Sequence, residues 1–486
     1  MASQGSQTIS LKVLIDKLLY YAHGNHSESV RLISKQPQPA TIGSLTNLYK
    51  WVENLEEQFF QTEACKSMLL HPRNPYGKEC RKLKLNIDDT EPTKYYICAD
   101  WNCSRPDEYE SDGLYSTFKN VRCNCGEMMD KEICMAKEDV GARAERDGGV
   151  FVCGTTKFMV TDDLQVEPIS PATIVTLLHK LGLGDMSSLQ ETILSIGSEE
   201  ILNLLKGSLF SKTPLTDVFL RKQGFTYEGI KFETEDAVQS KSSTCALMRS
   251  MNTQDVTLKL MTSTSMDKVL YAEAGEDMVD FLLSFLTFPL GSILQLLGGN
   301  SSMGSMDNLY RSVKHSKAMR DYELRDMLLN PGLSRGFGCR SNPLGVKESE
   351  QSAPSLWCRS YENGKNKDDP YTGYLSTEKS NLSISPSGDC SSILRFVCAG
   401  HQGFLKAPAT FRVMDNLVLK PLVSRWSLSI VKQLKVPLND LEVREINVRR
   451  EQGLRLLKAF LFSKSLLTDV LPAMVNFDLM NSKQEK

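Results

Sequence analysis

The chain has 486 residues, of which 41% are apolar and 24% are charged, and this composition excludes a disordered or fibrous protein. Its 57 basic and 59 acidic side chains give a formal charge of -2, which offers no global attraction to nucleic acid or anionic lipid. The length corresponds to about two large domains or three average ones.

The start of the chain and its apolar runs argue against export and against a membrane span. Residues 1–8 are small and polar and lack the basic start and apolar core of a secretory signal. The longest apolar run, Met278–Leu290, contains Asp280 and is shorter than the roughly 20 residues that cross a bilayer, so it predicts a buried helix. The 13 cysteines are most simply reduced thiols. We therefore expect a protein of the cytoplasm or nucleus that is neither secreted nor attached to a membrane.

The chain contains an internal repeat. Phe210–Val218 reads FSKTPLTDV and Phe462–Val470 reads FSKSLLTDV, so seven of nine positions agree. Gly43–Tyr49 and Gly304–Tyr310 agree in the same way, as GSLTNLY and GSMDNLY. Repetition over such a distance indicates one structural unit that is used twice.

The repeat divides the chain into two homologous tandem units of an α+β fold, each with short strands and several helices. The first unit is predicted to span residues 1–222 and the second residues 256–478. Residues 223–255, rich in Ser, Thr and Gln, are predicted to be a linker, and residues 479–486 a polar tail. The first unit is about fourteen residues shorter near 22–29, so we expect it to be looser there or covered by another segment.

Apolar periodicity and turn residues predict the elements of the first unit. Alternation over Thr8–Asp16 predicts a strand, with Leu18–Ala22 as its hairpin partner. Gly43 and Ser44 stand where a helix begins, with Ser44 as its N-cap. Four further predictions are an exposed loop over the charged residues 132–147, a hairpin of Val150–Cys153 with Lys157–Thr161, a helix over Pro171–Leu181 with proline in its first turn, and a helix over Glu199–Phe210.

The second unit is predicted to open with strands at Val256–Met261 and Lys268–Ala274. Apolar residues at helical spacing then predict a helix over Asp277–Phe288, which Pro289 ends. The later predictions are a helix start at Gly304 and Ser305, a counterpart of the Pro171 helix at Ser424–Leu434, and a last helix over Gly453–Phe462.

The repeated segments resemble a plant family known only as a domain of unknown function, number six hundred and seventy-four. The resemblance rests on IGSLTNLYKWVENL from Ile42, on the long run FQTEACKSMLLHPRNPYGKECRKLKLNIDDTEPTKYYIC that ends at Cys98, on RCNCG from Arg122, and on the FSK-x-x-LTDV endings. It covers nearly the whole chain and implies a land-plant source and two tandem units, but no activity. The first unit departs from the family pattern, because it lacks the AEAG turn and apolar helix that the second keeps at Ala272–Leu290.

Four cysteines form the one group of residues in the sequence that indicates a chemical site. Cys98 and Cys103 are followed by Cys123 and Cys125 in the pattern C-x4-C-x19-C-x-C-G. Four thiolates in two close pairs can close tetrahedrally on zinc, and Gly126 suits a tight knuckle. A zinc ion in this zinc-ribbon-like loop would be structural, because four protein ligands leave no position for water. Two alternatives stay open: four reduced cysteines without metal, and a redox-labile or disulfide pair.

The second unit is predicted to lack this site. Aligning Leu356–Cys358 with Tyr96–Cys98, and Gly373–Thr377 with Gly113–Thr117, leaves one of the four cysteines in place. Asn363, Ser383 and Ser385 take the positions of the other three.

No catalytic residue and no cofactor-binding residue is predicted. The chain has no GxSxG elbow, Walker loop or HExxH motif. His23 and His26 have metal-like spacing but lie in a polar loop, His71 precedes a proline and suits turn capping, and His179 lies on the surface of a predicted helix.

Three classes of function remain. The leading one is a non-enzymatic interaction or scaffold protein with protein partners and one structural zinc ion. The first alternative is a nucleic-acid-associated protein that presents the basic Lys119 and Arg122 and the stacking rings of Tyr115 and Phe118. The second is an enzyme of unrecognised type with a pocket between the units, lined by residues such as Glu276, Asp280 or His315.

Overall fold

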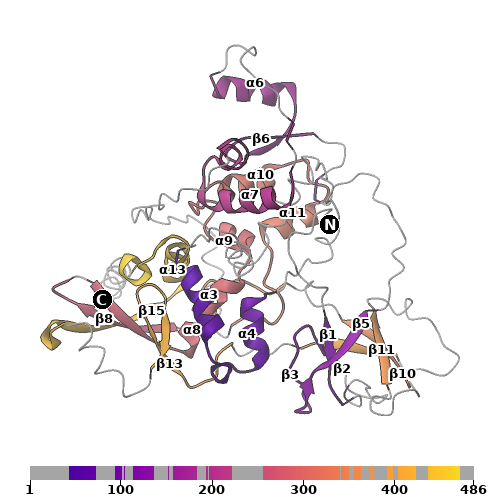
Figure 1. The fold of residues 1–486 in the computed structure, drawn as a ribbon, viewed down its shortest axis with the longest axis vertical. Helices are drawn as coiled ribbons and strands as arrows, with labels where there is room; N and C mark the ends of the chain where they lie inside the picture. Colours follow the sequence, from indigo (N-terminus) through magenta and orange to yellow (C-terminus); the bar gives the residue numbers. More distant parts are fainter. Residues whose placement is uncertain are drawn as a thin grey trace, which may run out of the picture.

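Apart from one helix at residues 171–180, the described part of the protein, a computed structural model, forms three bodies. In Figure 1 they are a β-sheet with helices at the lower left, a small barrel at the lower right and a group of helices above. Each body combines segments of residues 1–222 and of residues 256–478, which we call the N-terminal half and the C-terminal half. The described residues are 43–72, 94–100, 103, 113–135, 151–152, 157–182, 193–194, 196–221, 256–266, 268–339, 341–349, 355–362, 371–376, 391–397, 403–422 and 436–470.

The sheet belongs to the C-terminal half and is antiparallel, in the order β14-β13-β9-β8-β15. Burial alternates along the first part of β8 (Val256–Ser263), as its apolar alternation predicts, so one face meets the core. β9 (Lys268–Gly275) returns beside β8, and both predicted strands are confirmed. The remaining elements of this sheet are β13 (Thr410–Val413), β14 (Leu419–Pro421), the 3-10 turn η8 (Leu438–Asp440) and β15 (Leu441–Val448).

Helix α8 (Glu276–Thr287) is the buried centre of this body and confirms the predicted helix. Every residue from Met278 to Thr287 is buried, which fits a helix that is apolar nearly all round. Pro289 separates α8 from α9 (Leu290–Leu296), because proline has no N–H to continue the first helix. The predicted last helix is confirmed as α13 (Arg450–Phe462), whose Phe460 ring meets Phe285 of α8 edge to face at 5.1 Å between centroids.

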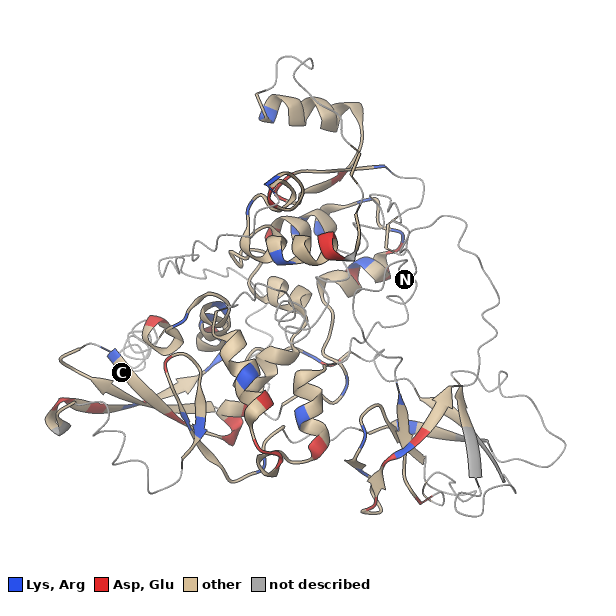
Figure 2. Cartoon of the chain, in the orientation of Figure 1, with Lys and Arg blue, Asp and Glu red and all other residues tan. Residues whose placement is uncertain are grey.

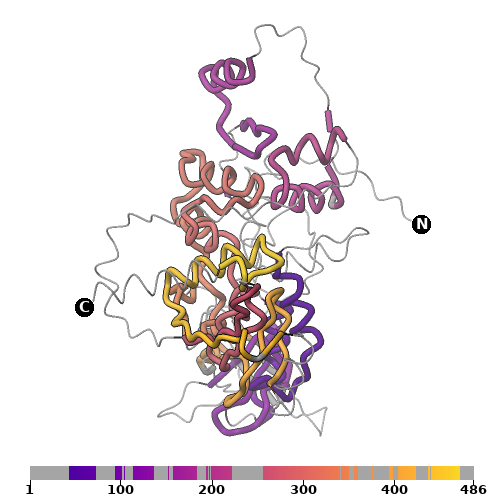
Figure 3. Tube along the Cα trace, turned by 90° about the vertical axis from the view of Figure 1, so that its left-hand side faces the viewer, coloured from indigo at the N-terminus to yellow at the C-terminus, as the bar shows by residue number. Residues whose placement is uncertain are grey.

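Two helices of the N-terminal half pack on this C-terminal body. They are α3 (Leu45–Asn54) and α4 (Glu63–Leu70), with the short turn η1 (Glu57–Phe59) between them. Both contact α8, and α3 lies beside α13 in the views of Figures 1 and 3. The start of α3 therefore meets the end of the chain's last helix.

Backbone N–H groups, a serine hydroxyl and an asparagine amide form the hydrogen bonds between the α3 region and the C-terminal half, a contact that we call the α3 dock. Its residues are Gly43, Ser44, Asn47, Phe60 and Gln61 on one side and Phe404, Leu405, Asn416, Phe460 and Ser463 on the other. Phe60 and Leu405 form an isolated antiparallel bridge. The hydrogen bonds run from Ser44 N to Phe460 O (3.1 Å), from Ser44 Oγ to Ser463 O (2.7 Å), from Asn47 Nδ2 to Asn416 O (3.0 Å) and from Gln61 N to Phe404 O (3.0 Å).

The upper body repeats this arrangement with the two halves exchanged. Here α10 (Met306–His315) of the C-terminal half lies on elements of the N-terminal half, and α11 (Tyr322–Leu329) packs against α10 and α9. Those elements are the predicted helix α7 (Ser198–Phe210), the π-helical turn η4 (Thr216–Arg221) and the hairpin of β6 (Phe158–Val160) with β7 (Val166–Pro168).

The hydrogen bonds of this second contact, the α10 dock, match those of the α3 dock one by one. Its residues are Gly304, Ser305, Asn308, Met319 and Arg320 on one side and Phe151, Val152, Asp163, Ser208 and Ser211 on the other. Met319 and Val152 form the bridge. The hydrogen bonds run from Ser305 N to Ser208 O (2.9 Å), from Ser305 Oγ to Ser211 O (2.8 Å), from Asn308 Nδ2 to Asp163 O (2.9 Å) and from Arg320 N to Phe151 O (2.9 Å).

The predicted N-cap position of Ser44 is confirmed, but its side chain bonds the other half of the protein instead of its own helix. Ser44 and Ser305 do occupy the N-cap positions of α3 and α10, but neither hydroxyl accepts a bond from its own helix. Each hydroxyl instead donates to a carbonyl at the end of a helix in the other half. The repeated Gly-Ser is therefore a contact between the halves rather than a local helix signal.

The predicted hairpin of Val150–Cys153 with Lys157–Thr161 is wrong. β6 pairs with β7, which follows it, through a turn in which Leu164 has φ +59°. Val152 pairs instead with Met319 of the other half. Part of the predicted exposed loop 132–147 is wrong as well, because Glu132 lies within strand β5 (Lys131–Met135).

A six-stranded barrel closes across the two halves, in the order β1-β2-β12-β10-β11-β5. Each half gives an antiparallel set of three: β1 pairs with β2 and β5, and β10 pairs with β11 and β12. The halves meet through two parallel pairs, β12 with β2 and β11 with β5. The strands are β1 (Tyr95–Ile97), β2 (Gly113–Ser116), β10 (Leu356–Glu362), β11 (Tyr371–Ser376) and β12 (Ser391–Phe396), together with β5.

Helix α6 (Pro171–Lys180) confirms the predicted helix and stands away from the three bodies, at the top of Figures 1 and 3. Ser170 and Thr173 form its capping box, and Gly182 follows it with φ +67°. Other predictions lie outside the described residues: the strands at 8–22, the shortened stretch 22–29 with His23 and His26, the linker 223–255, the helix 424–434 and the tail 479–486.

Candidate metal centre

The barrel places the four cysteines beyond the end of β1 and on a neighbouring hairpin. Cys98 directly follows β1, and Ala99 N donates to Met128 O across to the hairpin of β3 (Val121–Arg122) and β4 (Met128–Met129). This hairpin turns through Cys123–Gly126, where Cys123 N donates to Glu127 O and Gly126 N donates to Cys123 O. Gly126 has φ +98°, which a residue with a Cβ rarely adopts, so the predicted glycine knuckle is confirmed.

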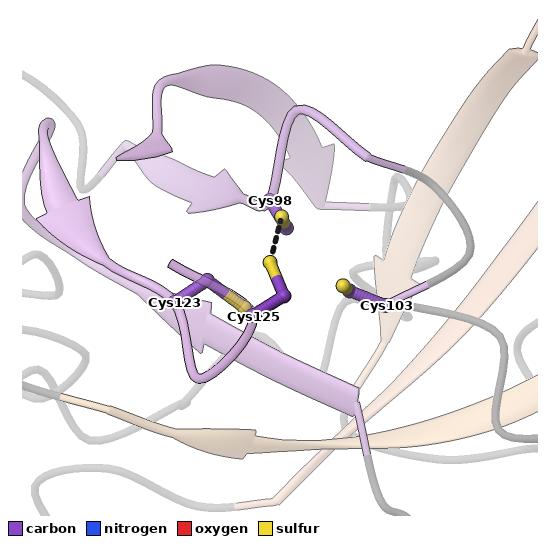
Figure 4. A group of neighbouring side chains, drawn as sticks. All are labelled: Cys98, Cys103, Cys123 and Cys125. Carbon is purple, nitrogen blue, oxygen red and sulfur yellow. Dashed lines mark hydrogen bonds between the residues drawn. The ribbon is translucent and has the colours of Figure 1, made fainter. Parts of the chain in front are cut away.

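The four sulfur atoms lie in one cluster, shown in Figure 4. The Sγ atoms of Cys98, Cys103, Cys123 and Cys125 all lie within 4.8 Å of one another, and Cys98 Sγ lies 3.6 Å from Cys125 Sγ. Four sulfurs at about 2.3 Å from a tetrahedral zinc ion stand about 3.8 Å apart. Cys98 and Cys123 are buried, Cys103 is half-buried and Cys125 is exposed, so the cluster sits at the surface of the protein. Its size fits a metal ion bound by all four cysteines.

Burial and hydrogen bonds shift the pKa values of three of the four thiols, and not all in the same direction. Burial raises the pKa of Cys98 well above its ordinary value. The hydrogen bond with Cys125, followed by burial, raises the pKa of Cys103 to about 11. The backbone N–H of Glu127, followed by the thiol of Cys103, lowers the pKa of Cys125. Metal binding requires deprotonated thiols, so a divalent cation bound by all four cysteines would oppose the upward pKa shifts of Cys98 and Cys103.

Comparison with known proteins places the chain in a family but gives no activity. The profile of a family described as "Protein of unknown function (DUF674)" matches residues 28–451. The chain belongs to this family. No curated protein and no solved structure matches the sequence.

The barrel corrects the predicted alignment of the two halves by one residue. Tyr96 and Ile97 lie opposite Ser116 and Tyr115, whereas Trp357 and Cys358 lie opposite Ser376 and Leu375. Cys358 thus takes the place of Ile97, and Arg359 takes that of Cys98. A shift of one residue moves a side chain to the other face of a strand. Cys358 is accordingly buried inside the barrel among Ile97, Tyr115, Ile133, Leu356, Leu375 and Leu394, and the other predicted counterparts, Asn363, Ser383 and Ser385, lie outside the described residues.

The residues predicted to line an enzyme pocket are each engaged with backbone at a different place. Asp280 is buried in α8, where its Oδ1 accepts hydrogen bonds from Phe404 N and Leu405 N at 3.0 Å. Burial raises the pKa of Asp280 to about 7, although these two donors act in the opposite direction. Glu276 Oε2 accepts from Ala409 N (3.3 Å), and His315 is exposed at the end of α10. A cavity beneath α10 is lined mainly by apolar side chains, among them Val152, Phe158, Leu309 and Met319.

The aromatic residues predicted to stack on nucleic-acid bases are buried. Tyr115 is 1% exposed inside the barrel and packs against Phe396, with ring centroids 5.6 Å apart. Phe118 is 4% exposed and packs edge to face on Phe337. Lys119 and Arg122 are exposed, but basic and acidic residues are interspersed over the described elements, as Figure 2 shows. The prediction that these two rings stack on bases is therefore wrong.

No local sequence motif marks the residues that form the two docks. In the sequence, Asn47 and Asn308, which bond the opposite half, look like ordinary surface residues. The same holds for Asp162 and Asp415, which each bond a threonine of their own half. The available signal was that they recur at matched positions, together with the Gly-Ser pairs and the FSK endings. Among the described residues, no helix is both long and apolar enough to cross a membrane.

Proposed function

We propose that this protein is a non-enzymatic, protein-binding scaffold in which Cys98, Cys103, Cys123 and Cys125 hold one structural zinc ion. The observation that carries the proposal is the approach of all four sulfurs to within 4.8 Å of one another. Four cysteine ligands fill the tetrahedral shell of zinc and leave no position for a substrate or an activated water. A reducing compartment, the cytosol or the nucleus, would keep these thiols available, and the family resemblance implies a plant source.

The zinc ion would hold the surface connections of the barrel together. Cys98 and Cys103 flank the chain that leaves β1, and Cys123 and Cys125 form the turn of the β3–β4 hairpin. The hairpin itself is a ladder of two residue pairs, Val121 with Met129 and Arg122 with Met128. So short a hairpin is not stable by itself in water, and metal binding supplies folding free energy to the segment that carries the ligands.

The proposal includes two related units, residues 1–222 and 256–478, joined in one chain. Its support is the matched hydrogen bonding of the α3 dock and the α10 dock and the matched strand sets of the barrel. A further matched pair lies beside them: Asp162 accepts from Thr216 N and Oγ1, and Asp415 accepts from Thr468 N and Oγ1. Two related units, of which one would bind a metal, suit a scaffold because the binding surface of each unit can change in sequence independently of the other.

Elemental analysis of the full-length protein, purified under reducing conditions without chelator, tests the zinc proposal. We expect one zinc ion per chain, lost when Cys98, Cys103, Cys123 and Cys125 are all replaced by serine. Cys134→Ser is the matched control, because Cys134 is an exposed cysteine of β5 outside the cluster, and it should keep its zinc. Limited proteolysis should also show faster cleavage within residues 98–129 after Cys123→Ser.

Wild-type protein that binds no metal under these conditions contradicts the zinc centre. Zinc retained in the quadruple serine variant would assign the metal to other residues. Cleavage of residues 98–129 at the same rate in wild type and Cys123→Ser would contradict a structural role for the ion.

A further inference from the structure

Each half of this protein makes a matching helix contact with the other half. The helix start at Ser44 lies on the C-terminal half, and the matching start at Ser305 lies on the N-terminal half. The matched hydrogen bonds agree in length to about 0.2 Å, since Ser44 N to Phe460 O is 3.1 Å and Ser305 N to Ser208 O is 2.9 Å. The contact is therefore reciprocal: each half gives one helix start and receives one.

Both docks depend on a close approach of backbone to backbone. A Cβ placed on Gly43 would lie 2.5 Å from Phe460 O, and one placed on Gly304 would lie 2.6 Å from Ser208 O. Both glycines also have positive φ, +44° and +48°. A side chain at either position would clash with the backbone of the other half, so each glycine is a specific requirement of its own dock.

The barrel adds a second reciprocal surface. The strand set β1, β2, β5 offers the edges of β2 and β5, and the set β10, β11, β12 offers the edges of β12 and β11. Each set alone leaves two open edges, and the parallel pairs between the sets close all four. Open edges of this kind bind a matching strand from any chain that presents one.

We propose that each half is a binding site for the opposite half of a second copy of this chain, so that two copies can form a reciprocally exchanged dimer. The docks and the barrel edges are the same contacts whether the opposite half is on the same chain or on another. The choice between them is then set by effective concentration, which the connection between residues 221 and 256 controls. This inference names one partner of the proposed scaffold and requires no metal.

Complementation between two defective full-length chains tests the exchange. Gly43→Ala blocks the α3 dock and Gly304→Ala blocks the α10 dock, so each variant alone has one intact dock. When the two are co-expressed with different affinity tags, the N-terminal half of the Gly304→Ala chain and the C-terminal half of the Gly43→Ala chain together have no blocked contact. We expect the two tags to co-purify in equal amounts as a dimer, with at least several-fold more soluble protein than either variant gives alone.

Matched controls distinguish the exchange of halves from nonspecific association of the two chains. Two differently tagged copies of Gly43→Ala should show no rescue, because every pairing between them has a blocked α3 dock. Gly275→Ala should behave as wild type, since a Cβ there meets nothing within 4 Å and φ is -73°. Equal co-purification in the mismatched and the identical pairs, or no rescue in the mismatched pair, would overturn the proposal.

A second measurement uses wild-type docks and so does not depend on how the variants fold. A protease site is placed between residues 223 and 255 of the full chain, and the folded protein is cleaved there. We expect the two fragments to elute together in gel filtration, and two differently tagged cleaved samples to exchange halves after mixing. Fragments that elute separately would overturn the proposal. Zinc measured in the same samples distinguishes this result from a failure of the metal centre.

Discussion

The α3 dock and the α10 dock have the same hydrogen bonds but different interiors. Phe460 in α13 packs against Phe285 of α8, whereas the corresponding residue of α7, two positions before the phenylalanine of the FSK ending, is Ser208. Lys206 of α7 is buried, and burial lowers its pKa, whereas its counterpart Lys458 is half-exposed. Backbone positions and short polar side chains therefore determine the geometry of both contacts, while the packing beneath them differs.

The two docks should differ most in how much the residue beneath each one contributes to the free energy of unfolding. Phe460→Ala removes a buried ring from the Phe285 contact and should lower the free energy of unfolding by about 3–5 kcal/mol. Ser208→Ala removes a hydroxyl that bonds within its own helix, to Leu205 O, and should cost less than about 1 kcal/mol. Urea unfolding of the two variants checks this, and equal costs would mean that the two interiors are equivalent.

The next effect concerns Asp280, a residue of α8 beneath the α3 dock. Its pKa of about 7 lies above the ordinary 3.8, so folding takes up a proton between these values and the stability from this group falls as pH rises from about 4 to about 7. Asp280→Asn keeps the acceptor for Phe404 N and Leu405 N but cannot ionise. The variant should gain about 2–4 kcal/mol relative to wild type across this pH range, at 1.36 kcal/mol per pKa unit. Parallel stability curves for the two proteins would refute the assignment.

Replacing the aspartate of either acidic turn by alanine should lower the free energy of unfolding by the same amount. Asp415 and Asp162 each accept two hydrogen bonds from a threonine, Thr468 and Thr216. Replacing either aspartate by alanine leaves a partly buried backbone N–H without its acceptor and should cost about 1–3 kcal/mol. Hydrogen exchange of the Thr468 and Thr216 amides reports each loss locally. A loss several times larger at one site would show that the turns differ as the interiors do.

The smallest effect should be removal of the docking hydroxyls. Ser44→Ala and Ser305→Ala each delete one hydrogen bond to a carbonyl of the other half and should cost about 0.5–1.5 kcal/mol. Thermal unfolding of the single and double variants should give additive shifts, because the two docks share no residue. Strong non-additivity would indicate that the docks act as one coupled unit.

The elements that could be predicted from the sequence are those whose structure depends on a short stretch of residues, such as regular apolar spacing or a proline at a helix end. The helices α6, α7, α8 and α13 follow from apolar spacing, helped by Pro171 at the start of α6 and Pro289 after α8. The cysteine cluster follows from its spacing and Gly126. The hairpin of β6 was missed because its turn places Leu164, rather than glycine or asparagine, at positive φ.

The arrangement of the halves could not be predicted, because a repeat identifies matching residues without saying which copy they contact. The same pattern would arise if Ser44 bonded the ending of its own half at Ser211 rather than Ser463 of the other. The register of β10 failed for a related reason. Aligning Cys358 with Cys98 matches two identical residues, but the pairing of β10 with β11 places Cys358 opposite Leu375 and inside the barrel.

The order of strands in the barrel has a consequence for how the chain is made. β2 and β5 are complete by Met135, but their partners β12 and β11 are synthesised only after residue 370. At about 5–20 residues per second, these two edges wait roughly tens of seconds on the ribosome for their partners. All four cysteines have emerged early in that interval. The proposed zinc centre would then form before the barrel closes, and until closure the unpaired edges of β2 and β5 are open to chaperones and to neighbouring chains.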